Sequence, residues 1–335
     1  MMTMKATALA HPNIAFIKYW GMQDEDLKLP ANDSISMNIG CLSTRTTVEY
    51  DPALKADEIQ LNGSYLSGAG LARVKSFMCH LRQMTGHSLF ARINSENNFP
   101  TGAGLASSAS AFAALALAGT AALGLTLSEQ ELSSLARWGS GSACRSIPGG
   151  FVEWRTDSST HQSYAASFAS EQHWKLMDCI AIVSSEHKQI GSEAGMRLAA
   201  TSPLQGARIQ DTERRFSQCR QAILKHDFMT LSQVTELDCS MMHAVMMTSN
   251  PPLFYWQPQS LGIIMAVKQW QAKGLPVTYT LDAGPNVHVI CPQEIAGDIL
   301  PRLKMIPGVL EVLKGLPGGP ARLIPEDSRL ESEKV

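Results

Sequence analysis

The sequence has no surplus of charge of either sign, because its 335 residues carry 28 Lys and Arg against 30 Asp and Glu, a net charge of −2. Binding to nucleic acid or to an anionic membrane surface is driven by a positive surplus, so the composition offers no electrostatic case for either. We therefore expect no nucleic-acid partner and no membrane partner. Apolar residues make up 44% of the chain, which is too apolar for disorder and typical of a globular enzyme.

The sequence also lacks paired cysteine spacings. None of its seven cysteines stands in a CxxC or a Cys/His pattern of the kind that binds zinc. Scattered thiols in odd number are typical of a reducing compartment. The first residues, Met1–Thr7, have no basic segment followed by an apolar stretch, so we expect a cytoplasmic protein without a secretion signal.

Long runs of large apolar side chains are missing as well. The stretch from Thr101 to Ser128 carries no charge, but its residues are mostly Ala, Ser, Gly and Thr. Such a composition is too weakly apolar for a membrane-spanning helix. It predicts a helix buried in a globular protein instead, in a chain long enough for two domains.

What the sequence does contain is centred on residues 97–110, Asn-Asn-Phe-Pro-Thr-Gly-Ala-Gly-Leu-Ala-Ser-Ser-Ala-Ser. Gly102 and Gly104 permit tight turns that expose amide N–H groups. A helix is expected from Leu105 onward, and its first amides have no partner within the helix. Together these features predict an anion site, most naturally for phosphate.

Ser107 and Ser108 add hydroxyls that can bind phosphate oxygens or a magnesium ion. The alternative is a small-residue helix packed closely against a neighbour. The stretch is not the GxxxxGK[ST] P-loop, because no lysine follows the second glycine. It resembles the PxxxGLxSSAS phosphate loop of the GHMP kinase superfamily, and its flanks are similar to those of the mevalonate diphosphate decarboxylase branch.

Three further segments carry the same resemblance. Residues 13–22 resemble the family signature NIAxIKYWGK, residues 139–150 resemble its GSGSAxRSxxGG loop, and Asp282–Asn286 matches its DAGPN motif. Taken singly, Lys18 and Arg145 would be solvent-exposed cations and Asp282 would cap a turn. Within these ordered motifs, a functional role is favoured for all three.

The resemblance covers residues 8–325 and implies an α+β GHMP kinase fold with two domains. The N-terminal domain, residues 1–186, is expected to hold a mixed sheet of the ribosomal-S5-like kind, and the C-terminal domain, residues 187–335, to be ferredoxin-like. The active site is expected in the cleft between them. The resemblance also implies a homodimer.

The implied reaction is ATP-dependent decarboxylation of a phosphorylated mevalonate, with ATP and Mg²⁺ bound. The implied catalytic residues are Asp282 as base or orienting group for the C3 hydroxyl, Lys18 beside the transferring phosphoryl group, and Arg145 on the C1 carboxylate. The implied substrate contacts are Asn13, Tyr19, Ser140, Ser142, Arg145, Ser192 and Met196. The implied nucleotide contacts are Asn62, Ser95, Gly102, Gly104, Leu105, Ala106, Ser107 and Ser108, with Ser107 as metal ligand.

Two positions depart from the family pattern, which has a lysine at Met22 and an arginine at Glu193, both facing the substrate 5-diphosphate. Losing two hydrogen bonds to charged groups could cost about 3–6 kcal/mol, and Glu193 would add repulsion towards a distal phosphate, although Arg197 could compensate. Our hypothesis from the sequence is therefore a phosphomevalonate decarboxylase that makes isopentenyl phosphate. The alternatives are a mevalonate 5-diphosphate decarboxylase, a mevalonate 3-kinase that stops at the phosphorylated intermediate, and a non-catalytic ligand-binding protein.

Periodicity and capping signals add expectations for the secondary structure. Apolar spacing predicts a helix over residues 70–84 and helical segments over 205–226, 229–247 and 260–273. Ser128 and Glu131 predict a capped helix start. Leu176–Ser184 predicts a buried strand, and 187–197 has no periodicity and is expected to be a linker.

Overall fold

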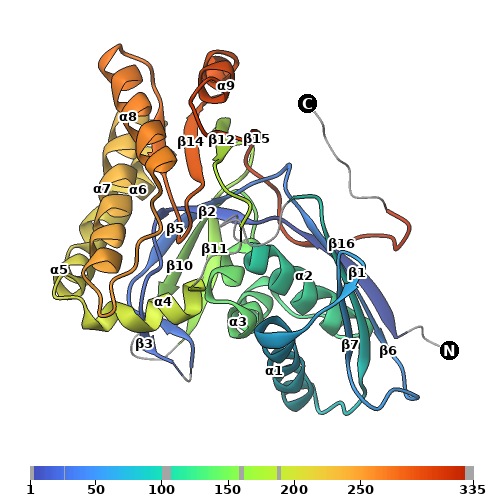
Figure 1. Ribbon diagram of the computed structural model, residues 1–335. Helices are drawn as coiled ribbons and strands as arrows, with labels where there is room; N and C mark the ends of the chain where they lie inside the picture. Colours follow the sequence, from blue (N-terminus) through green and yellow to red (C-terminus); the bar gives the residue numbers. More distant parts are fainter. Residues whose placement is uncertain (1–3, 26, 100–106, 158–161, 187–189, 329–335) are drawn as a thin grey trace.

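The computed structural model describes residues 4–25, 27–99, 107–157, 162–186 and 190–328. Within them the strands form three larger sheets and one two-stranded hairpin. The first and third sheets lie towards opposite sides of the molecule (Figure 1).

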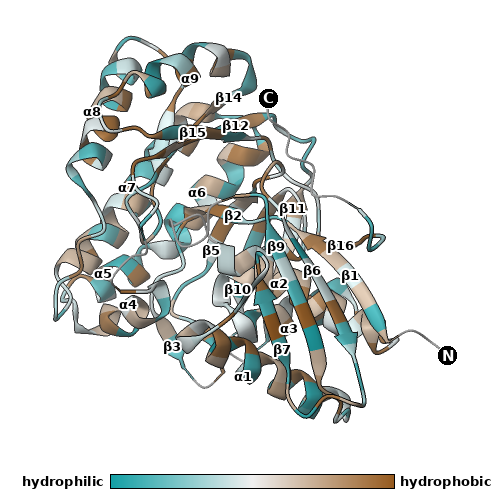
Figure 2. Cartoon of the chain, turned by 45° about the vertical axis from the view of Figure 1, so that its right-hand side comes forward, coloured by the Kyte–Doolittle hydropathy of each residue, from teal (hydrophilic) through white to brown (hydrophobic). Residues whose placement is uncertain are grey.

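The first sheet has six strands in the order β16-β1-β6-β9-β7-β8. β7 and β9 run parallel and the other neighbours antiparallel, so the sheet is mixed. Buried and partly exposed residues alternate along β6, as expected for a sheet with one covered face. Figure 2 shows teal and brown segments alternating along these strands. The strands are β1 (Lys5–Ala10), β6 (Thr44–Tyr50), β7 (Glu58–Leu61), β8 (Ser64–Tyr65), β9 (Ala91–Asn97) and β16 (Arg322–Leu323).

Three helices cover the inner face of this sheet: α1 (Gly68–Thr85), α2 (Ser107–Ala122) and α3 (Glu129–Gly139). α2 packs directly on β1 and β6, and its alanines and glycine allow this close approach. A Cβ on Gly119 would lie 2.9 Å from Leu81 of α1. The small residues of α2 thus do pack closely against neighbouring elements, as the alternative interpretation of residues 97–110 expected for the helix.

The second sheet, in the order β11-β10-β5-β2, lies at the centre of the chain fold. Every residue of β2 and β5 is buried, because helices and the third sheet pack around them. The strands are β2 (Asn13–Ile17), β5 (Ser34–Asn38), β10 (Phe151–Thr156) and β11 (Ser163–Ala169), with the hairpin β3 (Met22–Asp24) and β4 (Leu29–Pro30) between β2 and β5.

The third sheet is antiparallel, in the order β13-β14-β12-β15. Its strands are β12 (Leu176–Ile182), β13 (Thr278–Thr280), β14 (Val287–Pro292) and β15 (Glu311–Gly315). The accompanying helices are α4 (Ser192–Leu198), α5 (Gln205–Gln210), α6 (Thr212–Leu224), α7 (Phe228–Met247), α8 (Pro258–Ala272) and α9 (Ala296–Lys304), with short 3₁₀ helices η1 (Gly141–Ser146), η2 (Ala199–Thr201) and η3 (Gln293–Ile295). α7 packs against both β13 of this sheet and β2 of the second sheet, and α6 packs against α7, β2 and β5.

The α+β two-domain prediction is confirmed. The helix over 70–84, the buried strand from Leu176 and the helix start at Ser128 are also present, the last as a complete capping box with Glu131. None of the helices in the described ranges combines the length and apolar content that a membrane crossing requires.

Three sequence-based expectations need correction. The expected linker over 187–197 contains the helix α4, too short to show apolar periodicity. The segment 205–226 is divided at Asp211 into α5 and α6. The predicted division at residue 186 separates β12 from β14 and β15, with which it pairs, so the sheets divide before Leu176. Strand pairing across more than 100 residues leaves no local signal.

Candidate active site

A cleft of about 670 Å³ lies where the segment after β2, the start of α2, η1 and α4 meet the turn after β13. Most of the predicted catalytic and substrate residues line this cleft, from both halves of the chain: Lys18, Tyr19, Ser140, Ser142, Arg145, Ser192, Met196 and Asp282.

Lys18 and Asp282 form an ion pair at the floor of the cleft. The Lys18 ammonium donates to Asp282 Oδ1 at 2.6 Å, and Lys18 is only 1% exposed. The two residues meet because the end of β13 lies beside β2, with the Thr280 hydroxyl donating to the Ala15 carbonyl at 3.5 Å. Burial alone would raise the pKa of Asp282, but Lys18, His288 and Arg145 lower it below its usual value. Asp282 is therefore held as a carboxylate.

Arg145 is a buried cation whose hydrogen-bond partners are all neutral. Its guanidinium donates to Ser34 Oγ at 2.7 Å, Ser36 Oγ at 3.1 Å and Asn13 Oδ1 at 3.2 Å. Arg145 is 3% exposed, and in the described part of the chain no carboxylate oxygen lies within 4 Å of its guanidinium nitrogens. Burial lowers its pKa. A guanidinium fork held by neutral groups at a cleft wall is suited to bind a ligand carboxylate.

Asn13 lies behind Arg145 rather than on the cleft wall. Its amide donates to Ser142 O at 3.1 Å and to Ser146 Oγ at 2.8 Å, at the two ends of η1. Its carbonyl oxygen accepts from Arg145. Asn13 thus fixes η1 and the guanidinium together, and a direct substrate contact stays a prediction.

Serine hydroxyls gather where η1 meets the start of α2. Ser140 Oγ lies 3.2 Å from Ser108 Oγ and 3.4 Å from Ser142 Oγ. The segment 139–146, which resembles the start of the family's GSGSAxRSxxGG loop, is the end of α3 followed by η1. Gly141 is required there because a Cβ would lie 2.6 Å from the Tyr19 ring.

The start of α2 carries the predicted nucleotide contacts Ser107 and Ser108, and both line the cleft. Gly102, Gly104, Leu105 and Ala106 lie outside the described residues. In the described ranges no group of three or more His, Cys, Asp or Glu could hold a metal ion. A magnesium ion here would need anionic ligands supplied by phosphate, with the Ser107 hydroxyl beside them, and the cleft fits that mode of binding.

The other end of the cleft holds a cluster of cations that the sequence reasoning missed. Lys28 Nζ donates to Glu193 Oε1 at 2.9 Å, Arg73 Nε lies 3.7 Å from Glu193 Oε2, and Arg197 lies 3.6 Å from Glu193 Oε1. Burial would raise the pKa of Glu193, but Lys28, Arg73 and Arg197 together lower it. We call Lys28, Arg73, Glu193 and Arg197 the cation cluster. The negative charge of Glu193 is therefore compensated, contrary to our expectation of repulsion.

Comparison with known proteins gives this architecture a family. Residues 10–165 match the model of the diphosphomevalonate decarboxylase-like N-terminal domain, and residues 179–313 match that of the mevalonate 5-diphosphate decarboxylase C-terminal domain. The chain belongs to the diphosphomevalonate decarboxylase family. This is a family of ATP-dependent decarboxylases of the mevalonate pathway.

Individual members of the diphosphomevalonate decarboxylase family align over nearly the whole chain. The diphosphomevalonate decarboxylase of Ganoderma lucidum is 38% identical over 90% of this chain and 81% of its own length. The solved mevalonate diphosphate decarboxylase of Staphylococcus aureus superposes with a TM-score of 0.91 at 36% identity, covering 96% of this chain and 98% of that one. A further solved structure, MDDEF in complex with MVAPP, AMPPCP and magnesium, has a TM-score of 0.90 at 37% identity, with the same coverage.

Two predicted contacts of the decarboxylase lie away from the cleft wall. Asn62 and Ser95 touch one another, since the Asn62 N–H donates to the Ser95 carbonyl at 2.9 Å. Asn62 has a φ of 49° in a two-residue Asn-Gly turn between β7 and β8, the sequence typical of a tight hairpin. Neither is among the described residues that line the cleft, so their role at the nucleoside stays a prediction.

Proposed function

We propose that this chain is a mevalonate 5-diphosphate decarboxylase, which consumes ATP and releases carbon dioxide, phosphate and ADP with isopentenyl diphosphate. The observation that carries the proposal is that one cleft is lined by three features: the Lys18–Asp282 pair, Arg145 with its neutral partners, and the cation cluster. A substrate with a hydroxyl, a carboxylate and a terminal phosphate matches them.

The chemistry explains why ATP is consumed. The C3 hydroxyl is a poor leaving group, and phosphorylation converts it into one that can depart as phosphate while carbon dioxide is lost from C1. The ionised Asp282 would accept the hydrogen bond of the C3 hydroxyl and take up its proton during phosphoryl transfer. Lys18, at 2.6 Å from Asp282, would offset negative charge as the phosphoryl group arrives.

Arg145 would bind the C1 carboxylate through the bidentate geometry of its guanidinium. Its three neutral acceptors fix the guanidinium plane without neutralising it, so its charge remains available. The start of α2 supports nucleotide binding, with Ser107 and Ser108 on the cleft wall. A magnesium ion bound with the nucleotide, beside the Ser107 hydroxyl, would supply charge neutralisation there.

The cation cluster supports the 5-diphosphate over the 5-phosphate as the substrate. Our hypothesis from the sequence favoured the 5-phosphate, because Met22 and Glu193 replace two cations of the family pattern. In the fold, three cations face two carboxylates, since Glu25 pairs with Arg197 at 3.3 Å and Glu193 with all three. Lys28 stands in the turn that follows the strand of Met22, and Arg137 adds a further cation to the cleft wall. This surplus and the family relatives both support the diphosphate.

The deciding experiment compares kcat/KM for mevalonate, its 5-phosphate and its 5-diphosphate on one preparation, followed as ADP and carbon dioxide release. We expect the diphosphate to be preferred by at least about tenfold over the 5-phosphate, the effect of one hydrogen bond to a charged group. Preference for the 5-phosphate would restore the earlier hypothesis. Release of ADP without carbon dioxide would indicate a mevalonate 3-kinase. Release of neither product would indicate a non-catalytic binding protein. Homodimeric assembly and a cytoplasmic location stay predictions.

A further inference from the structure

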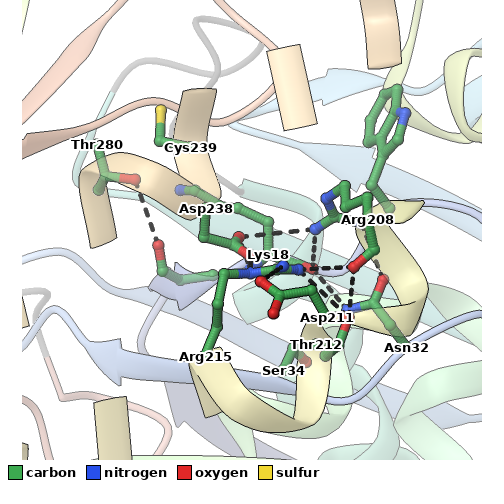
Figure 3. A network of polar contacts seen from close by, with 12 residues as sticks. Lys18, Asn32, Ser34, Arg208, Asp211, Thr212, Arg215, Asp238, Cys239 and Thr280 are labelled. Carbon is green, nitrogen blue, oxygen red and sulfur yellow. Dashed lines mark hydrogen bonds and ion pairs between the residues drawn. The ribbon is translucent and has the colours of Figure 1, made fainter. Parts of the chain in front are cut away.

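Lys18 lies one residue beyond the end of β2, where its backbone groups have no strand partner. β2 ends at Ile17, which pairs with Ile35 of β5. Backbone N–H and C=O groups that are buried require partners, and here side chains supply them. The Lys18 N–H donates to Asp238 Oδ2 at 2.7 Å, and the Lys18 carbonyl accepts from Arg208 at 2.7 Å and from Asn32 at 2.9 Å (Figure 3).

These partners are tied to one another and come from the segment between β4 and β5, which holds Asn32, and from the helices α5 and α7. Arg208 of α5 also donates to Asn32 Oδ1 at 3.0 Å. Arg215 of α6 donates to Asp238 Oδ1 of α7 at 2.9 Å and to Asp211 at 2.8 Å. Arg208, Arg215 and Asp238 are each at most 1% exposed. Figure 3 shows the side chains converging on the Lys18 peptide unit.

A buried ionic network of this kind is weak evidence for stability, because the cost of removing the charges from water offsets their attraction. Here the charges balance, with Lys18, Arg208 and Arg215 facing Asp211, Asp238 and Asp282. None of Asn32, Arg208, Arg215 and Asp238 is among the described residues that line the cleft. Any effect of the network on the reaction must therefore pass through Lys18.

We propose that Asn32, Arg208 and Asp238 clamp the backbone N–H and C=O groups of Lys18, with Arg215 holding Asp238, and thereby position the Lys18 ammonium against Asp282. We call these four residues the Lys18 clamp. They are positioning residues. A lysine side chain has four rotatable bonds, so fixing its backbone limits where the ammonium can lie. A misplacement of about 1 Å at a reacting centre can lower a rate by about 10²-fold.

The first test is Arg208→Gln, which removes one hydrogen bond to the Lys18 carbonyl and the adjoining one to Asn32. We expect kcat to fall by about 10- to 100-fold while KM for both substrates stays within about twofold, because Arg208 does not reach the cleft. The matched control is Arg214→Gln. Arg214 binds Asp211, an acid of the network, at 2.7 Å, but its side chain is exposed and does not contact Lys18. The control should keep full kcat. Equal kcat in the two folded variants would overturn the proposal.

A double-mutant cycle separates positioning from general loss of stability. In a Lys18→Met background, Arg208→Gln should cost no further kcat, because the group that it positions is gone. Additive losses would mean that Arg208 acts independently of Lys18. If Arg208→Gln fails to fold, Asn32→Ala takes its place, since it removes only one donor to the Lys18 carbonyl.

The kinetic tests of the Lys18 clamp rest on the proposed function, because they follow the decarboxylation reaction. A measurement without substrate tests the clamp separately. The carboxyl ¹³C signal of Asp282, assigned with Asp282→Asn, is titrated in the wild type and in Arg208→Gln. The charged or titratable groups around Asp282 are Lys18, Arg145 of η1, His243 of α7 and His288 of β14. Displacing Lys18 should raise the Asp282 pKa in the variant, and an unchanged titration would overturn the clamp. Loss of decarboxylation in the wild type would instead overturn the proposed function.

Discussion

The two ends of the cleft are built differently, although both present cations to an anionic substrate. At the reaction end, the Lys18 and Arg145 side chains are almost fully buried, and fixed partners hold the Lys18 backbone and the Arg145 guanidinium. In the cation cluster, the side chains of Lys28, Arg73 and Arg197 are 27%, 34% and 56% exposed and share one carboxylate. Buried groups act in a low dielectric, whereas exposed pairs are weakened by water and salt.

The difference indicates a division of labour between the ends. Fixed, dry charges stabilise a transition state because they need no reorganisation during the reaction, so the reaction end should control kcat. Half-exposed charges on long side chains hold a distal phosphate without a strict geometry, so the cation cluster should control KM. The following substitutions test this division, beginning with the largest expected effect.

Asp282→Asn should lower kcat by at least about 10²-fold, the scale for losing a positioned acid–base group. ATP affinity, measured by calorimetry, should remain nearly unchanged, because the substitution leaves the start of α2 intact. Asp298→Asn, on the exposed side of α9, is the matched control and should be neutral. Near-normal turnover of Asp282→Asn at saturating substrate would remove Asp282 from the mechanism.

Lys18→Met should move the acid limb of the kcat–pH profile towards neutral pH, in addition to lowering kcat. In the wild type the pKa of Asp282 is lowered, so Asp282 stays ionised at pH values below the ordinary titration range of an aspartate. The stability that this ionised group contributes is present above the unfolded pKa and is lost as the pH falls through the folded pKa. Without Lys18, burial is opposed only by weaker influences, and the pKa should rise. An unshifted acid limb in Lys18→Met would show that Asp282 does not govern it.

Arg73→Gln should raise KM for the 5-diphosphate by about tenfold and leave kcat within about twofold. Arg73 is partly exposed, so we take the lower end of the value of a hydrogen bond to a charged group. KM for the 5-phosphate should change less, because that substrate lacks the distal phosphate. The control is Arg92→Gln on the outer face of the first sheet, which pairs with Asp51 and Glu58. A loss confined to kcat would contradict the division.

The sequence predicted the reaction end well and the phosphate end poorly, for a physical reason. Lys18, Arg145 and Asp282 stand in ordered motifs, and the fold brings these motifs to one cleft. Lys28 and Arg73 come from a hairpin turn and the middle of α1, where an exposed cation has no distinguishing local pattern. The Lys18 clamp was missed for the same reason, since its members are spread over the segment before β5 and three helices and meet only through tertiary packing.

The charge of Glu193 was misjudged because sequence gives its sign but not its neighbours. Read alone, a carboxylate at a phosphate-binding position predicts repulsion. In the fold it accepts a hydrogen bond from Lys28 and lies beside Arg73 and Arg197, which lower its pKa and keep it ionised. A carboxylate whose sign predicts repulsion of a phosphate can therefore gather neighbouring cations around itself in the fold.

Glu193→Gln is the smallest expected change and the sharpest test of the difference between the two ends. Exposed ion pairs contribute about 0–1 kcal/mol, so the melting temperature and kcat should change little. Freed of their shared carboxylate, Lys28, Arg73 and Arg197 should attract a distal phosphate more strongly, which would lower KM for the 5-diphosphate by a few-fold and steepen its dependence on salt. These are measured as KM at two ionic strengths. If KM rises instead, Glu193 is required to hold the cations in place, and the cation cluster is as preorganised as the reaction end.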